Sequence, residues 1–176
     1  MKFYLIFGSI LNFLFGIGNE PMKTENKFQV VHQAMNEAAK EIQTKYNLNF
    51  GGISEQTDKD NNNKYEHIGL MFNSSQYISK EEARKIVLGI NEIFLSKLNT
   101  ERVKPYLTVF PFTEKNIHTC ITFRISKKNW DHSQISTFGF HFGKVFYWYD
   151  IPNEKYKTRK EEESYSEALK ILEQGS

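Results

Sequence analysis

The stretch FGFHFGKVFYWYD, residues 138–150, restricts the fold more than any other part of the chain. Apolar residues occupy every second position on both sides of Gly143, and this period is that of a β-strand with one buried face. A glycine in a two-residue connection between two such runs is typical of a β-hairpin. We therefore predict strands over residues 135–142 and 145–151, joined by a turn at Gly143 and Lys144.

One face of this hairpin is predicted to lie in the core of the protein. Its residues are Phe138, Phe140, Phe142, Val145, Tyr147 and Tyr149. The predicted turn pairs Phe142 with Val145 at the end of the hairpin. The opposite face also carries large side chains, because His141, Phe146 and Trp148 point away from the core.

Two other segments, residues 65–72 and 117–126, alternate in the same way. In the second segment Ile117, Ile121, Phe123 and Ile125 are assigned to the core side. The opposite side carries His118, Cys120, Thr122 and Arg124. This facing is strongly specified, because a slip by one residue would expose the whole apolar set. Residues 48–53 and 106–110 are predicted as short strands.

Three segments place apolar residues at helical spacing. The first covers residues 28–46. The second begins with Ser79 and Glu82, which form a capping-box pattern in which each residue satisfies a free backbone N–H of the other. The third is predicted to begin with a similar pair, Thr158 and Glu161, and to end just before Gly175.

These elements follow one another in the order α-β-β-α-β-β-β-β-α, which is typical of an α+β fold. We predict a single α+β domain over residues 25–174. In it an antiparallel sheet of about five strands packs against helices on one face.

The composition excludes several classes of protein. The net charge of +2 arises from 23 basic and 21 acidic residues that are intermixed along the chain, so no nucleic-acid partner is predicted. A single cysteine rules out an intrachain disulfide and a multi-cysteine metal centre. No cofactor is predicted.

Residues 1–18 are predicted to form a hydrophobic leader. Its apolar run is shorter than the roughly 20 residues of a transmembrane helix and suits a secretory signal peptide. Gly16 and Gly18 are the small residues before an expected cleavage at Asn19. The alternative is an uncleaved anchor, so the protein is expected to be exported or membrane-associated. If translation starts at Met22 instead, a cytoplasmic protein is expected.

Several motifs of the chain resemble those of a family of small uncharacterised proteins from chlamydia-type intracellular bacteria. The motifs are RVKPYLTVFPFT, NIHTCITF, GKVFYWYD and EESYSEAL. The matching positions are Arg102, Pro105, Tyr106, Leu107, Pro111, Phe112, Thr113, Asn116, Gly143, Lys144, Tyr147, Asp150, Glu163, Tyr165, Glu167, Ala168 and Leu169. The resemblance covers residues 28–172 and implies a fold and an envelope location, but no activity. Some family members have lipoprotein leaders, whereas the leader of this chain has no cysteine.

The polar residues of the sheet include the residue types of two kinds of site, a thiol-dependent hydrolase and a metal site. Cys120 and His141, with Asp150 orienting the imidazole, have the residue types of a thiol-dependent hydrolase. Cys120 nevertheless lies within a strand and not at the helix N-terminus that would activate a thiol. A metal site from His118, His141 and Asp150 lacks the close-spaced ligand pair common in zinc sites, and no metal is predicted.

The aromatic residues on the outer face of the sheet suggest a binding surface instead. Aromatic rings and arginine in a polar surround are typical of partner-binding sites. We expect a non-enzymatic binding module of the bacterial envelope or host interface, which uses Arg124, His141, Phe146 and Trp148 to bind a protein or a small ligand. The alternative is that Trp148 only covers the backbone of Gly139 or packs beneath the C-terminal helix.

Overall fold

The computed structural model describes residues 26–123, 134–150 and 158–174. The helices are α1 (Lys27–Tyr46), α2 (Lys80–Leu98) and α3 (Tyr165–Gln174), and a short 3-10 helix spans Lys104–Tyr106. The strands are β1 (Asn49–Asp58), β2 (Lys64–Ser74), β3 (Ile117–Phe123), β4 (Ile135–His141), β5 (Lys144–Asp150) and β6 (Thr158–Ser164). The predicted leader and Arg124 lie outside the described residues.

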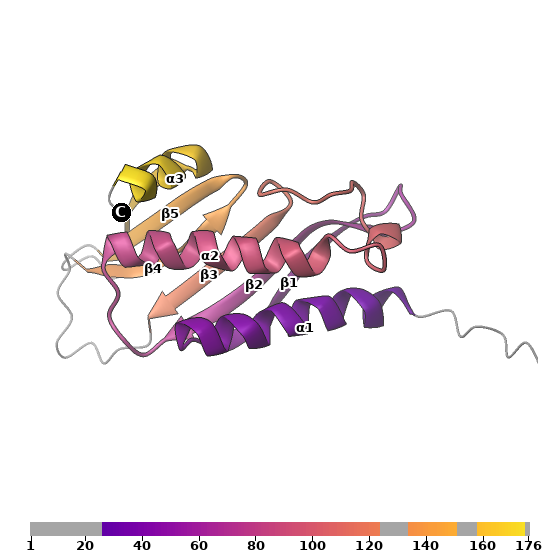
Figure 1. Cartoon of the computed structure of the whole chain (residues 1–176), viewed down its shortest axis with the longest axis horizontal. Coiled ribbons are helices and arrows are strands. Elements are labelled where there is room, and N and C mark those ends of the chain that lie inside the picture. The colour runs from indigo at the N-terminus through magenta and orange to yellow at the C-terminus, as the bar shows by residue number, and fades with distance from the viewer. Residues whose placement is uncertain (1–25, 124–133, 151–157, 175–176) are drawn as a thin grey trace, which may run out of the picture.

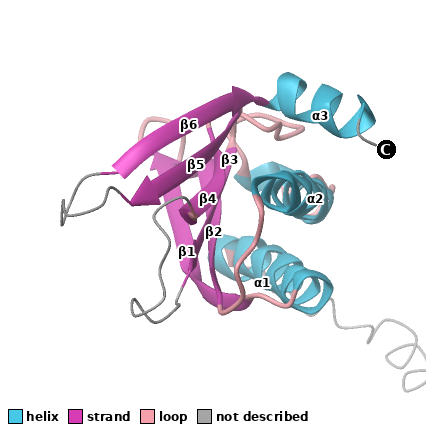
Figure 2. Cartoon of the chain, turned by 90° about the vertical axis from the view of Figure 1, so that its left-hand side faces the viewer, coloured by secondary structure: helices cyan, strands magenta, loops and turns pink. Residues whose placement is uncertain are grey.

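The strands form one six-stranded sheet whose spatial order, β1-β2-β3-β4-β5-β6, is the order of the sequence (Figure 1). The described helices all lie on the same side of this sheet (Figure 2). Because α1 and α2 pack across it, the buried side chains of the strands and of these helices form one apolar core. The predicted α+β class is therefore confirmed, with helices on one face.

The two long helices begin and end as their sequences predict. The side chain of Asn26 accepts a hydrogen bond from the backbone N–H of Phe28, and Asn47 ends α1 in the left-handed conformation with φ 52°. Ser79 caps α2 by accepting a bond from the N–H of Glu82 at 3.2 Å. These signals are local, so each helix is specified without reference to the rest of the fold.

The sheet is mixed and not purely antiparallel as predicted. β2 and β3 run parallel, while each other neighbouring pair is antiparallel. The cause is α2, which carries the chain from the end of β2 back across the sheet, so that β3 starts in the direction of β2.

The element order α-β-β-α-β-β-β-β-α is found, but one predicted strand is replaced by another. Residues 106–110 do not form a strand; a 3-10 turn at Lys104–Tyr106 is followed by a single bridge from Leu107. Residues 158–164, predicted as helix, instead pair along β5 as strand β6. Helix α3 begins only after Ser164, which forms a capping box with Glu167.

The turn of the aromatic hairpin lies one residue earlier than predicted. His141 pairs with Lys144, so the two turn residues are Phe142 and Gly143, both with positive φ (47° and 77°) as a type I′ turn requires. Phe142 was assigned to the core but is 56% exposed. The other predicted core residues of the hairpin are buried.

A buried ion pair joins α2 to strand β6. The guanidinium of Arg84 donates two hydrogen bonds to the carboxylate of Glu163, at 2.7 and 2.9 Å, and the hydroxyl of Tyr147 donates a third. Burial opposes ionisation of Glu163, but these bonds outweigh it and the pKa of Glu163 is lowered. The pair fixes the last strand to the helix layer.

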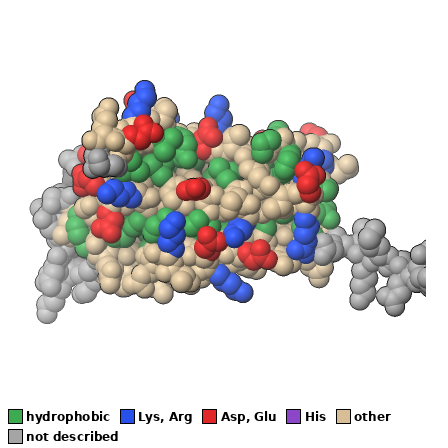
Figure 3. All heavy atoms as spheres, viewed as in Figure 1, with side chains coloured by type: hydrophobic (Ala, Val, Ile, Leu, Met, Phe, Trp, Pro, Cys, Tyr) green, Lys and Arg blue, Asp and Glu red, His purple; other side chains and the backbone are tan. Residues whose placement is uncertain are grey.

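The helix side shows charged side chains of both signs with hydrophobic side chains between them (Figure 3). Within the described ranges, no helix is both long and apolar enough to cross a membrane.

Candidate functional site

The sheet face opposite the helices carries the aromatic pair that the sequence placed there. Phe146 and Trp148 project from β5 with ring centroids 5.9 Å apart, and Trp148 is 40% exposed. No described helix covers this surface, which we term the outer face (Figure 2). Trp148 is therefore not buried beneath α3.

Two glycines allow the rings of Phe146 and His118 to lie close to the backbone on the outer face. A Cβ atom at Gly139 would lie 2.0 Å from the carbonyl oxygen of Thr119 and 2.9 Å from Cζ of Phe146. A Cβ atom at Gly69 would lie 2.1 Å from Nε2 of His118. The ring of Phe146, rather than that of Trp148, thus covers the backbone of Gly139, and the indole is free to contact other groups.

A pocket of about 200 Å³ opens on the outer face beside these rings. Outward side chains from four strands form its walls: His118, Cys120, His141, Phe146, Trp148, Lys160 and Glu162. Thr119 and Phe140 also line it, although their side chains face the core. The pocket is therefore built by strand pairing, because β3 to β6 must all be in register to bring these residues together.

The imidazoles and the thiol of the pocket favour their uncharged forms. Burial, assisted by His141 and His67, lowers the pKa of His118 to about 4. Burial likewise lowers the pKa of His141 and raises the pKa of the Cys120 thiol. At neutral pH these three groups offer uncharged hydrogen-bonding edges.

The charged groups of the pocket are already paired with each other. Nζ of Lys160 lies 2.6 Å from the carboxylate of Glu162, and Nζ of Lys144 lies 3.7 Å from the same carboxylate. The hydrogen bond from Lys160 lowers the pKa of Glu162, which is ionised at neutral pH. One carboxylate thus lies between two ammonium groups.

Three histidines gather at the end of the outer face next to the hairpin turn. The rings of His118 and His141 are 5.7 Å apart, and the ring of His67 lies 5.1 Å from that of Phe142. His118 also forms a hydrogen bond with the hydroxyl of Ser54. The alternation over residues 65–72 places His67 on this side of β2, but it does not show that His67 lies near His118, because the pairing of β2 with β3 is not a local property.

The structure brings together three of the four predicted binding residues: His141, Phe146 and Trp148. Of the predicted triad, Cys120 and His141 line the same pocket, but Asp150 does not. Cys120 pairs with Gly139, so His141 is its diagonal neighbour, about 7 Å away between Cα atoms. Lys144, at one end of β5, pairs with His141. Asp150 lies at the other end of β5, about 20 Å from Lys144 along the strand.

Within the described ranges, no group of three or more His, Cys, Asp or Glu side chains is arranged to hold a metal ion. Comparisons with protein-family models, with curated proteins and with solved structures found no match. The resemblance to proteins of chlamydia-type bacteria therefore stays a prediction.

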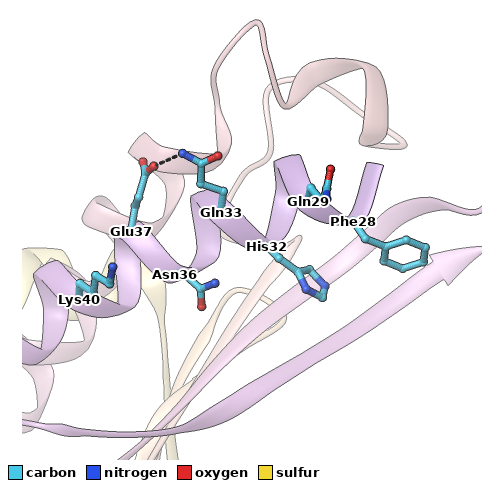
Figure 4. A pocket seen from close by; sticks show the side chains of 7 residues that line it. All are labelled: Phe28, Gln29, His32, Gln33, Asn36, Glu37 and Lys40. Carbon is cyan, nitrogen blue, oxygen red and sulfur yellow. Dashed lines mark hydrogen bonds between the residues drawn. The ribbon is translucent and has the colours of Figure 1, made fainter. Parts of the chain in front are cut away.

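A second, open hollow of about 520 Å³ lies along the exposed side of α1 (Figure 4). All its lining side chains come from this one helix: Phe28, Gln29, His32, Gln33, Asn36, Glu37 and Lys40. Two of them, Gln33 and Glu37, are bonded to each other at 2.9 Å, and His32 contacts Glu55 of β1. Because no other element contributes to its lining, we regard this hollow as a helix surface and not as a binding site.

Proposed function

We propose that this protein is a non-enzymatic binding module that binds a protein partner through the outer face of β3–β6. The observation that carries the proposal is the position of Trp148, which is 40% exposed at the rim of a pocket. A large aromatic side chain that stays in water adds little to the stability of the fold, whereas at binding surfaces such side chains commonly supply much of the binding energy. Phe146 and His141 extend the same surface.

Photo-crosslinking tests this proposal. The photoreactive residue p-benzoylphenylalanine replaces Thr137, which pairs with Trp148 across β4 and β5, in one version of the protein and Phe28 in a control, since Phe28 is 52% exposed on α1. We expect a cross-linked protein from position 137 and none from position 28, and the purified cross-linked protein should bind the chain. Cross-linking from position 28 alone, or captured proteins that do not bind when purified, would contradict the proposal.

The alternative function, a thiol-dependent hydrolase, requires an ionised Cys120. Burial raises the pKa of this thiol, which is the opposite of what a nucleophile needs. We therefore expect iodoacetamide to label Cys120 in the folded protein with a midpoint above the ordinary cysteine value of about 8.5. A midpoint below about 6.5 would support the hydrolase, because only an activated thiol ionises there.

We further propose that the leader, residues 1–18, exports the protein or tethers it to a membrane. The support is the apolar run in the sequence, which has the length of a signal-peptide core. Alkaline phosphatase fused after the leader should be active in a bacterial periplasm, and deletion of residues 1–18 should abolish that activity. If the fusion stays inactive with the leader present, the protein is cytoplasmic, as expected for a start at Met22.

A further inference from the structure

The size of the outer-face pocket limits its ligand to a single ring or side chain. Its volume of about 200 Å³ is smaller than the roughly 300–1,000 Å³ of pockets that hold cofactors or drug-sized molecules. An extended partner segment lying across the strands could place one side chain in it.

The charges around the pocket disfavour a charged side chain. A cation would meet the ammonium groups of Lys160 and Lys144, which share the carboxylate of Glu162. The two charged side chains that line the pocket, Lys160 and Glu162, neutralise each other, so an anion would find no net positive charge in the lining. Because the charges at this site are already paired with each other, a charged ligand group would be buried here without an ionic partner, which is energetically costly.

The walls suit an aromatic ring with a polar edge. Phe146 and Trp148 are tilted by 50° with respect to each other and provide ring surfaces for stacked or edge-on contact. His141 also lines the pocket, and among the described residues no hydrogen bond to its ring nitrogens is found. An uncharged imidazole can donate a hydrogen bond to a hydroxyl group or accept one from it.

We propose that this pocket binds the side chain of a tyrosine in the partner protein, with its ring against Phe146 and Trp148 and its hydroxyl at His141. This inference rests on the proposed function and specifies the chemistry of the partner. Phenylalanine would fill the same space without the hydrogen bond. Lysine and arginine would be rejected because of the two neighbouring ammonium groups.

Titration of ¹⁵N-labelled protein with N-acetyl-tyrosinamide tests the inference. We expect saturable shifts, in the millimolar range typical of so small a ligand, of the Trp148 indole N–H and of the Gly139 and Cys120 amides. N-acetyl-phenylalaninamide should bind more weakly by about twofold to tenfold, the effect of one hydrogen bond. N-acetyl-lysinamide and N-acetyl-leucinamide should cause no saturable shift at these signals.

Variants separate the pocket from general effects on the fold. Trp148→Ala should abolish the shifts at Gly139 and Cys120, whereas Trp148→Phe and the distant Phe28→Ala should retain them. His141→Ala should remove the preference for tyrosine over phenylalanine. Each variant is first checked for a spectrum as well dispersed as that of the parent.

The inference is overturned if the tyrosine probe gives no saturable shift, or if the leucine or lysine probe binds equally well. Were a partner then still found to depend on Trp148, the binding surface would stand and only the ligand chemistry would be wrong. If neither the probe nor any partner depends on Trp148, the proposed function fails as well.

Discussion

Phe140→Asp is expected to unfold the protein. Phe140 is completely buried in the centre of the sheet and packs edge-on against Tyr165 of α3 with ring centroids 5.6 Å apart. Removing a buried phenylalanine costs about 3–5 kcal/mol, and an unpaired carboxylate in its place adds several more. The sum is comparable with the whole stability of a domain, about 5–15 kcal/mol.

The control is the next residue of the same strand. His141 points to the outer face and is exposed, so His141→Asp should change the free energy of unfolding by less than about 1 kcal/mol. Circular dichroism and thermal melting of both variants provide the measurement. If Phe140→Asp melts like the parent, or His141→Asp unfolds as well, the assignment of the two faces is wrong.

Glu163→Ala should lower the free energy of unfolding by about 3–5 kcal/mol, because it leaves the buried guanidinium of Arg84 without its partner. Arg84 is only 5% exposed and donates two hydrogen bonds to this one carboxylate. Tyr147 loses its hydrogen-bond acceptor at the same time. Denaturant unfolding of the purified protein measures the effect.

Glu161→Ala is the matched control for this prediction. It removes the same charge from the same strand, but the pair of Glu161 with Lys80 is partly exposed, so a change of less than about 1 kcal/mol is expected. Replacing Arg84 and Glu163 together by Met and Leu should recover most of the loss, since no buried charge then remains unpaired. Equal effects of the two single alanine variants would show that Arg84 and Glu163 do not form a buried pair.

Local patterns predicted the two long helices and the facing of the strands β2 to β5 well. The caps of α1 and α2 need only residues within one turn, and the alternation in β3 decides that His118 and Cys120 face outward. The direction of the strands cannot be predicted from local patterns, because the parallel pairing of β2 with β3 depends on where α2 returns the chain. No property of either strand alone contains that information.

The errors at the hairpin turn and at β6 have physical reasons. Phe142 adopts a positive φ, which is rare for a bulky residue. The sequence therefore predicted a turn one residue later, at Gly143 and Lys144. Two capping-box patterns compete near the C-terminus, Thr158 with Glu161 and Ser164 with Glu167, and only the second begins a helix. Pairing with β5 and the bond from Arg84 to Glu163 make the first a strand.

The candidate site was predictable in part. Alternation along β4 and β5 identifies His141, Phe146 and Trp148 as outward residues, whichever turn is used. The contribution of Lys160 and Glu162 was missed, since their segment was assigned to a helix. Their pairing with each other is what makes the pocket suitable for an uncharged group.

The central claim, that the outer face binds a partner, is tested most directly by titrating a purified partner against two variants. Trp148→Ala should weaken binding by about 30-fold or more, the loss expected for an aromatic hot spot, while leaving the melting temperature close to that of the parent. Phe28→Ala, which removes a more exposed aromatic ring on α1, should bind like the parent. Unchanged binding of Trp148→Ala, or an equal loss in both variants, would contradict the account.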